Sequence, residues 1–195
     1  MDLIFASFDA ERPRELWDKH SGSLQGSATE IRGVALFRWL EGDAHWVGLY
    51  DVAPGTTDGA KAAVTNSLRE DLRATVGDVT RYVELFSSTD ARGVDECPFL
   101  IYMPTVDFSA DPSTEVAFNL WYDTKHLPEL AAAGLRGGRR FKANRAAWQY
   151  AALYDLESAA ILESEALAKA RGFGQFAPHV RGWKKCVLQR ILISR

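Results

Sequence analysis

The chain has few cysteines and no long apolar run. Only Cys97 and Cys186 are present among 195 residues, and their spacing does not suit a metal site. A chain of this length can bury a core without a cross-link, so we expect reduced thiols in a cytoplasmic protein. The longest apolar stretch, residues 97–106, contains Pro104 and is far shorter than the ~20 residues that span a bilayer. We expect no membrane segment, and the acidic start MDLIFASFDAERP is not typical of an export signal.

An excess of positive charge is also missing. The 23 lysines and arginines are outnumbered by 26 acidic residues, for a net charge of −3, so no broad positive field is available for a phosphate backbone. Nucleic acid is therefore not an expected partner. Basic residues cluster only in residues 135–145, which we interpret as a solvated strand and turn, with a docking site for an anionic ligand as the alternative.

Signatures of several enzyme classes are absent as well. The sequence has no phosphate-binding loop, no dinucleotide fingerprint and no serine or cysteine nucleophile motif. Its four histidines lack the spacing of a zinc or iron site, so we expect no metal. The partner that remains is a small-molecule substrate.

The sequence matches itself when it is shifted by 104 positions. The matches pair Leu16-Trp17 with Leu120-Trp121, Gly33 with Gly137, Phe37 with Phe141, and Leu49-Tyr50-Asp51 with Leu153-Tyr154-Asp155. Such self-similarity indicates an internal repeat. We predict two copies, residues 1–90 and 97–195, joined by the polar stretch 87–97.

Each copy has the same pattern of elements. A short apolar run predicts a strand, and it is followed by a helix, a hairpin of two strands, a second helix (residues 58–75 or 158–171) and a last strand. This β-α-β-β-α-β order is the ferredoxin-like unit. One face of its sheet lacks helices and must be covered, so we predict an α+β fold in which two ferredoxin-like repeats pack sheet to sheet within one chain. Such a protein can be a monomer or a homodimer.

The helix of the second copy carries a recognisable motif. The pattern W-Y-D-x-x-H-x-P at residues 121–128, followed by a hairpin strand that ends in LYDLES, resembles the dimeric α/β-barrel superfamily and especially its EthD-like members. The resemblance implies a barrel of two ferredoxin-like units with a small-molecule cleft between sheet and helices. It also implies that His126 matches the helix-end histidine of the family. In the first copy His20 lies two positions off this register and no proline follows it, so we expect one functional cleft, in the second half.

The motif contains residue types suited to proton transfer. Pro128 cannot donate to the carbonyl of Thr124, so the helix should kink or end near His126. Tyr122 lies four residues before His126 on the same helical face, and Asp123 is close enough to orient the imidazole. We predict His126 as a general base, Tyr122 as a proton donor to a developing oxyanion, and Asp123 as the orienting group. The structural alternative is that His126 binds a backbone carbonyl and Tyr122 caps a strand.

Three further residues are predicted to contact a substrate. Trp121 belongs to the motif, and His45 and Gln149 occupy matching hairpin positions from which a side chain can point into the barrel. The alternatives are that Trp121 is a core residue and that His45 is an exposed strand residue.

Three functions fit these features. The first is a cofactor-independent EthD-like enzyme that acts by proton transfer, in a dehydration, decarboxylation or oxygenation of a small hydrophobic aromatic or carbonyl compound. The second is a non-catalytic small-molecule-binding or stress-related barrel. The third is a haem-binding barrel in which a histidine ligates the iron.

Overall fold

The structure is a computed structural model that describes residues 1–27, 30–41, 46–55, 58–143 and 148–191. The N-terminal half contains β1 (Asp2–Asp9), α1 (Pro13–Ser27), β2 (Ile31–Trp39), β3 (Trp46–Val52), α2 (Asp58–Asp71) and β4 (Thr75–Ser87). The C-terminal half contains β5 (Leu100–Tyr102), β6 (Thr105–Phe108), α3 (Pro112–Trp121), a π-helical turn (Tyr122–His126), α4 (Leu127–Ala132), β7 (Arg136–Lys142), β8 (Tyr150–Leu156), a 3-10 turn (Ala159–Glu163), α5 (Glu165–Ala170), a second 3-10 turn (Gly174–His179), β9 (Val180–Lys184) and β10 (Val187–Arg190). None of the described helices is long and apolar enough to cross a membrane.

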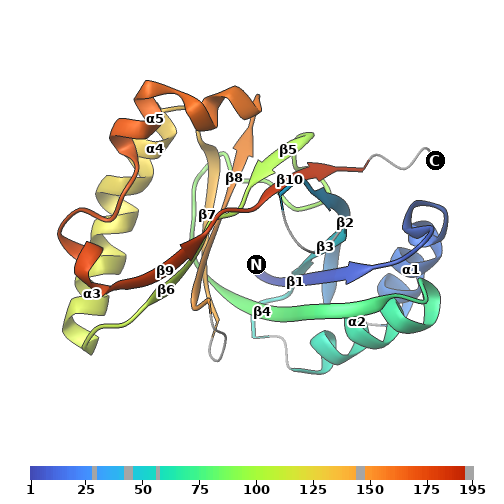
Figure 1. Cartoon of the computed structure of the whole chain (residues 1–195). Coiled ribbons are helices and arrows are strands. Elements are labelled where there is room, and N and C mark those ends of the chain that lie inside the picture. The colour runs from blue at the N-terminus through green and yellow to red at the C-terminus, as the bar shows by residue number, and fades with distance from the viewer. Residues whose placement is uncertain (28–29, 42–45, 56–57, 144–147, 192–195) are drawn as a thin grey trace.

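The strands of both halves form one closed barrel. Among the described residues, eight strands follow the order β5-β10-β2-β3-β1-β4-β7-β8, and β5 pairs with β8 to close the ring. Antiparallel pairing of β4 with β7 joins the halves on one side, and pairing of β10 with β2 joins them on the other. Helices α1 and α2 cover the outside of the first half, whereas α3, α4 and α5 lie on the opposite side of the barrel (Figure 1). The predicted intramolecular barrel is confirmed.

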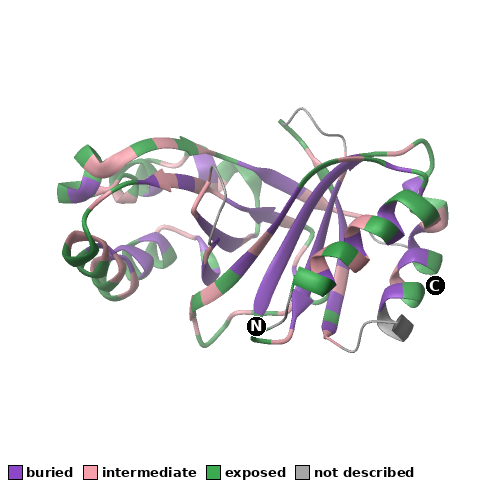
Figure 2. Cartoon of the chain, turned by 90° about the horizontal axis from the view of Figure 1, so that it is seen from below, coloured by how far each residue is buried: buried purple, intermediate pink, exposed green. Residues whose placement is uncertain are grey.

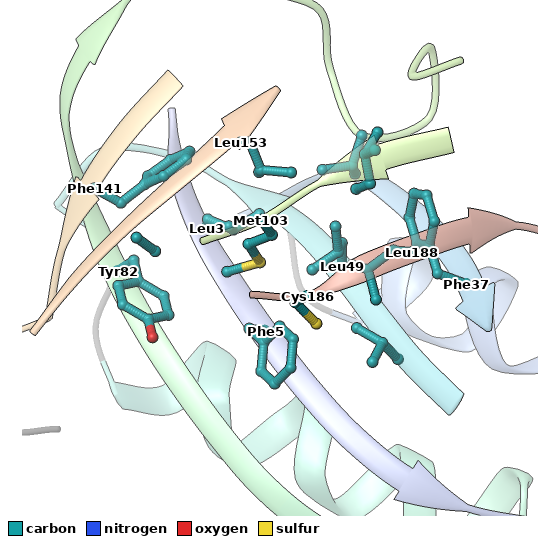
Figure 3. Packing of buried hydrophobic residues seen from close by; sticks show 14 of the residues in the cluster. Leu3, Phe5, Phe37, Leu49, Tyr82, Met103, Phe141, Leu153, Cys186 and Leu188 are labelled. Atoms are coloured by element: carbon teal, nitrogen blue, oxygen red, sulfur yellow. The ribbon is translucent and has the colours of Figure 1, made fainter. Parts of the chain in front are cut away.

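Burial on both faces explains why the strands are almost continuously apolar. In β1, Leu3 and Phe5 point into the barrel core, and Ile4, Ala6 and Phe8 pack under the helices of the first half. Figure 3 shows side chains from several strands meeting inside the barrel. The helices bury only one face, so their outer surfaces are exposed while the barrel strands are largely buried (Figure 2).

The first and last strands of the second half are each broken in two. Proline has no N–H to donate, and Pro104 lies between β5 and β6, where only its carbonyl bonds to the sheet by accepting from Ala152 N at 3.0 Å. Strands β9 and β10 separate at the same level, where Met103 N donates to Cys186 O at 2.8 Å. As a result, the paired strands β6 and β9 leave the barrel and extend towards α3 (Figure 1).

The second helix of the C-terminal half is shorter than predicted. Residues 158–171 do not form one helix, because Ser164 has an extended backbone and its side chain caps a new start by accepting from Leu167 N at 3.2 Å. The result is a 3-10 turn followed by the six-residue helix α5. In the first half the corresponding helix α2 runs over 14 residues. The helical layer over the second half is therefore thinner at this point.

The segment between the halves closes one end of the barrel. Val94 and Cys97 are buried in the barrel core, and Val94 N donates to the Asp51 carboxylate at 2.7 Å. Arg139, which is 3% exposed, pairs with the same carboxylate at 2.8 Å and with Glu84 at 3.1 Å. The predicted linker is thus part of the core, and a buried ion pair joins β3 of the first half to β7 of the second. Both cysteines are free.

Candidate functional site

The motif residues 122–126 form a π-helical turn between α3 and α4, and the helix does not end at His126. Asp111 caps the start of helix α3, where its carboxylate accepts from the backbone N–H groups of Ser113 and Thr114. At residues 122–126 the helix widens, and Leu127 N donates to Tyr122 O, five residues back. Pro128 follows directly, in the first turn of α4. Such π turns are common at functional sites, and this one places the Tyr122 and His126 rings edge to face with centroids 4.7 Å apart.

A cavity of about 360 Å³ lies beside this turn, between the sheet and the helices of the second half. Strands β5, β6, β8 and β9, helices α4 and α5, and the segment after α5 contribute to its wall. Most of the wall is apolar. The tyrosine, histidine and arginine side chains in it are Tyr102, Tyr122, Tyr154, His126 and Arg171. Its size and lining are typical of a site for a small, mainly apolar ligand.

His126 lies in the wall of this cavity. The residue is 5% exposed, and within the described part of the chain neither ring nitrogen makes a hydrogen bond. Trp121 stacks against the imidazole, with ring centroids 4.7 Å apart and an interplanar angle of 16°. Burial, with a smaller contribution from the positive charge of Arg140, lowers the pKa of His126 to about 4. The imidazole is therefore neutral at pH 7 and can accept a proton or ligate a metal.

Three tyrosines next to His126 keep their protons. The hydroxyls of Tyr122 and Tyr154 share a hydrogen bond of 3.0 Å, and burial raises the pKa of both phenols. Burial also raises the pKa of Tyr102 to about 12, and the ring of Tyr102 stacks on Tyr154 with centroids 6.3 Å apart. The cavity therefore contains a neutral base and neutral phenol donors.

Asp123 is close to the site but does not contact the imidazole. Its carboxylate forms an ion pair with Arg140, whose guanidinium also donates to the Asn119 side chain at 2.8 Å and lies 4.1 Å from the centre of the Tyr122 ring. The orienting hydrogen bond that we expected from Asp123 to His126 is not found among the described contacts. Asp123 instead holds Arg140 under the motif helix.

Sequence reasoning missed Arg140 because it lies in the basic run 135–145. The interpretation of that run as a solvated strand is wrong for Arg139 and Arg140, which are 3% and 2% exposed. Both are buried because each guanidinium meets a carboxylate. A signal for Arg140 was present. The polar residues 115, 119 and 123 are spaced four apart and so lie on one face of the helix. Arg140 and Lys142 are two apart and so lie on one face of the strand beneath it, where they pair with Asp123 and Glu115.

The structure does not bring the predicted substrate contacts together. Trp121 is half-buried and does not line the cavity, but its ring stacks on His126 and meets that of Tyr122 edge to face. Gln149 is half-buried just before β8, where its carbonyl accepts from Ala143 N at 2.8 Å, and it does not line the cavity beside His126. His45 lies outside the described residues.

The histidine of the first-half helix, His20, is held by hydrogen bonds. His20 is 0% exposed, and its nitrogens lie 2.9 Å from Ser67 Oγ and 2.9 Å from the Tyr50 hydroxyl. Ser67 Oγ donates to Asp71 at 2.7 Å, so we assign His20 Nδ1 as the donor to Ser67 and Nε2 as the acceptor from Tyr50. Both nitrogens are thus satisfied, and the imidazole has a structural role.

The buried His20 predicts that the protein loses stability in mild acid. Burial lowers the pKa of His20 to about 4, against the opposing effects of Asp71 and Ser67, while the unfolded chain has the ordinary value of 6.5. Between these two pKa values the unfolded state binds more protons than the folded state. The contribution of His20 to the free energy of unfolding is therefore fully present above pH ~6.5 and is lost as the pH falls to ~4. At about 1.4 kcal/mol per pKa unit, the loss is on the order of 3 kcal/mol. Urea unfolding of wild type and His20→Gln between pH 7 and pH 4.5 measures it, and equal pH dependence in both would contradict this assignment.

Comparison with known proteins identifies the fold. No family model matches the chain, and no curated protein matches it in sequence. The chlorite dismutase of Candidatus Nitrospira defluvii, in complex with imidazole, is 12% identical with a TM-score of 0.69, and the match covers 98% of this chain and 91% of that one. A heme-binding protein from Thermus thermophilus is 11% identical with a TM-score of 0.64, covering 97% and 90% of the two chains. A candidate monooxygenase from Lactobacillus acidophilus is 12% identical with a TM-score of 0.59, covering 97% and 92%.

Identities this low establish the architecture and not the activity. The matches extend over nearly the full length of both chains, so they include the closed barrel and the helices on its two sides. This chain has the dimeric α/β-barrel fold of chlorite dismutase-like structures.

Proposed function

We propose that the cavity beside His126 is the active site of a cofactor-independent, EthD-like enzyme that moves a proton on a small aromatic or carbonyl compound. The observation that supports this most is His126 itself, a buried neutral imidazole in the wall of a mainly apolar cavity whose ring nitrogens make no hydrogen bond to any described residue. A histidine that only stabilises the fold has its nitrogens satisfied, as those of His20 are.

The tyrosines can stabilise the negative charge that develops on the substrate when the proton is removed. If His126 takes a proton from a carbon or oxygen acid, negative charge develops on the neighbouring substrate oxygen, and a neutral phenol can donate to it. Tyr122 is the nearer donor, since its ring contacts that of His126, and Tyr154 supports it through their shared hydrogen bond. The three residues together can bind, orient and deprotonate one substrate.

The pKa of His126 limits the substrates that this site can activate. A base whose pKa is about 4 drives proton transfer weakly, so the proton removed must be acidic, as it is on a carbon between two carbonyl groups or on a phenol. Arg171, the only permanently charged side chain among the described residues of the wall, adds a preference for a ligand with an acidic group. The substrate class is therefore a compact, planar, acidic carbonyl compound or phenol.

Haem is a second candidate ligand, because a neutral imidazole with free nitrogens in an apolar cavity is a fitting axial ligand, and one matched structure is described as a heme-binding protein. The fit is incomplete. A ligating histidine usually donates its other N–H to a carboxylate or carbonyl, whereas the acidic residue of the motif, Asp123, pairs with Arg140. The haem group would supply redox chemistry, and no step of the proposed proton transfer depends on it. A binding role without catalysis is the third reading.

Exchange of an α-proton tests the proposal before the substrate is known. An aryl 1,3-diketone in D₂O should exchange the protons on the carbon between its two carbonyl groups faster with wild-type protein than in buffer, and NMR measures the rate. His126→Ala should remove this acceleration. Titration with haem separates the second candidate, because a Soret band that forms with wild type and is lost in His126→Ala would overturn the cofactor-free assignment. Stoichiometric binding of the diketone with no exchange above buffer would instead support the binding role.

A further inference from the structure

A second cavity lies inside the barrel, at the end opposite the one closed by residues 88–97. Its volume is about 260 Å³, and Ser7, Trp39, Asp78 and Trp148 lie in its wall. The cavity is on the other face of strands β6 and β9 from the His126 cavity. Val106 and Trp183 line the His126 cavity, whereas their neighbours Thr105 and Lys184 line this one. Alternate residues of a strand point to opposite faces, so the same two strands separate two distinct spaces.

Four aromatic rings lie in the wall of this barrel cavity. Phe5 and Trp39 meet edge to face with centroids 6.3 Å apart, and the rings of Tyr82 and Trp148 complete the set. Figure 3 shows Phe5, Tyr82, Met103 and Cys186, from four different parts of the chain, lying together in the barrel interior. An apolar cavity of about 150 Å³ is enough to hold benzene, so this one has room for a single ring with short substituents.

Lys184 gives this aromatic cavity a positive charge that no carboxylate of the described residues neutralises. The side chain is half-buried, its ammonium lies 4.3 Å from the centre of the Trp39 ring, and among the described residues no carboxylate lies within ion-pair distance of it. The indole N–H of Trp39 is buried and also lacks an acceptor in the described part of the chain. The next residue, Lys185, pairs with Glu41 at 3.2 Å.

The acidic residue of the cavity does not offset Lys184. Asp78 is exposed, and its carboxylate accepts from the Thr80 hydroxyl at 3.0 and 3.1 Å. Within the described part of the chain, Lys184 and the indole N–H of Trp39, two residues of the cavity wall, therefore lack an anionic partner, whereas Asp78 is exposed to solvent. A half-buried ammonium gains most from a charge-assisted hydrogen bond to a carboxylate.

We propose that the barrel cavity is a second ligand site, which takes a single-ring aromatic carboxylate with its ring between the aromatic walls and its carboxylate on Lys184. The site is independent of the chemistry proposed at His126, because the two cavities share no lining residue. Its size excludes large planar ligands, and its charge favours monoanions over neutral rings of the same shape.

Benzoate is the probe that tests this site, with benzyl alcohol as the neutral ring of similar shape. Binding is measured by calorimetry and by quenching of tryptophan fluorescence, since Trp39 and Trp148 line the cavity. Lys184→Met keeps the stem of the side chain on Trp39 but removes the charge, and it should weaken benzoate by about tenfold to a hundredfold. The matched control Lys185→Met should change the affinity less than twofold, and neither variant should change the weaker binding of benzyl alcohol.

Contacts measured on wild-type protein test the position of the ligand without any variant. Benzoate ring protons should show NMR contacts to the Met103 methyl group and to the Trp148 ring. The proposal is wrong if benzoate does not bind at millimolar concentration, if its contacts are to residues of the His126 cavity such as Leu130, or if Lys184→Met and Lys185→Met bind it equally well.

Discussion

Replacing Arg139 with methionine is expected to lower the free energy of unfolding by about 3–5 kcal/mol. The guanidinium pairs with Asp51 and Glu84 and donates to the backbone carbonyls of Met1 and Arg92. Asp51 is 1% exposed, and burial raises its pKa even with Arg139 beside it. Without Arg139 the carboxylate would be a buried charge with little compensation, and the link between β3 and β7 would be lost. Urea unfolding at pH 7 measures the effect.

The chain contains its own control for this experiment. Asp155 matches Asp51 when the sequence is shifted by 104 positions, but its partner Arg92 is exposed and 3.9 Å away, so Arg92→Met should cost less than ~1 kcal/mol. The double variant Asp51→Asn, Arg139→Met removes both charges and should recover a large part of the stability lost in the single variant. Equal losses from Arg139→Met and Arg92→Met would show that burial does not set the strength of these pairs.

The second large effect is expected at His126. Loss of a positioned base typically reduces a rate by 10²- to 10⁴-fold, so His126→Ala should reduce α-proton exchange by that factor. The fold should be retained, because the imidazole makes no hydrogen bond within the described residues and is held mainly by stacking on Trp121. Exchange kinetics and urea unfolding of the same preparations separate the two effects.

His20→Ala should have the opposite effect, with a loss of stability and little loss of activity. The substitution leaves the Tyr50 hydroxyl and Ser67 without their buried partner, at about 1–3 kcal/mol for each unsatisfied group. The activity of the remaining folded protein should stay within a few-fold of wild type, because His20 lies in the other half. If His20→Ala lost as much activity as His126→Ala in folded protein, the site would be assigned to the wrong half.

Local pattern was enough to predict the architecture. Short apolar runs that alternate with helical patterns predict a β-α-β-β-α-β order, and the matches at Trp17 and Trp121 and at Tyr50 and Tyr154 predict that it occurs twice. Each sheet has a face that only another sheet can cover, so the closed barrel follows from the repeat. The division into residues 1–90 and 97–195 and the catalytic roles of Tyr122, Asp123 and His126 stay predictions.

Contacts between distant residues were decided only by the tertiary structure. Arg139 and Arg140 are adjacent in a run that reads as solvated, but they point to opposite faces of β7, where one meets Asp51 in the barrel and the other meets Asp123 under the motif helix. Whether a charge is buried depends on such a partner, and the partner lies far away in the sequence.

The sequence by itself therefore determined the order of the elements, the barrel and the place of His126 on a helix over the sheet, because hydrophobic periodicity and the constraints of proline act over a few residues. The tertiary structure decided which histidine is free. His20 and His126 are both buried beside a tryptophan and a tyrosine, but His20 binds Ser67 and Tyr50, whereas His126 lies in the wall of a cavity. Cavities and hydrogen-bond partners arise from how elements pack, which no local pattern records.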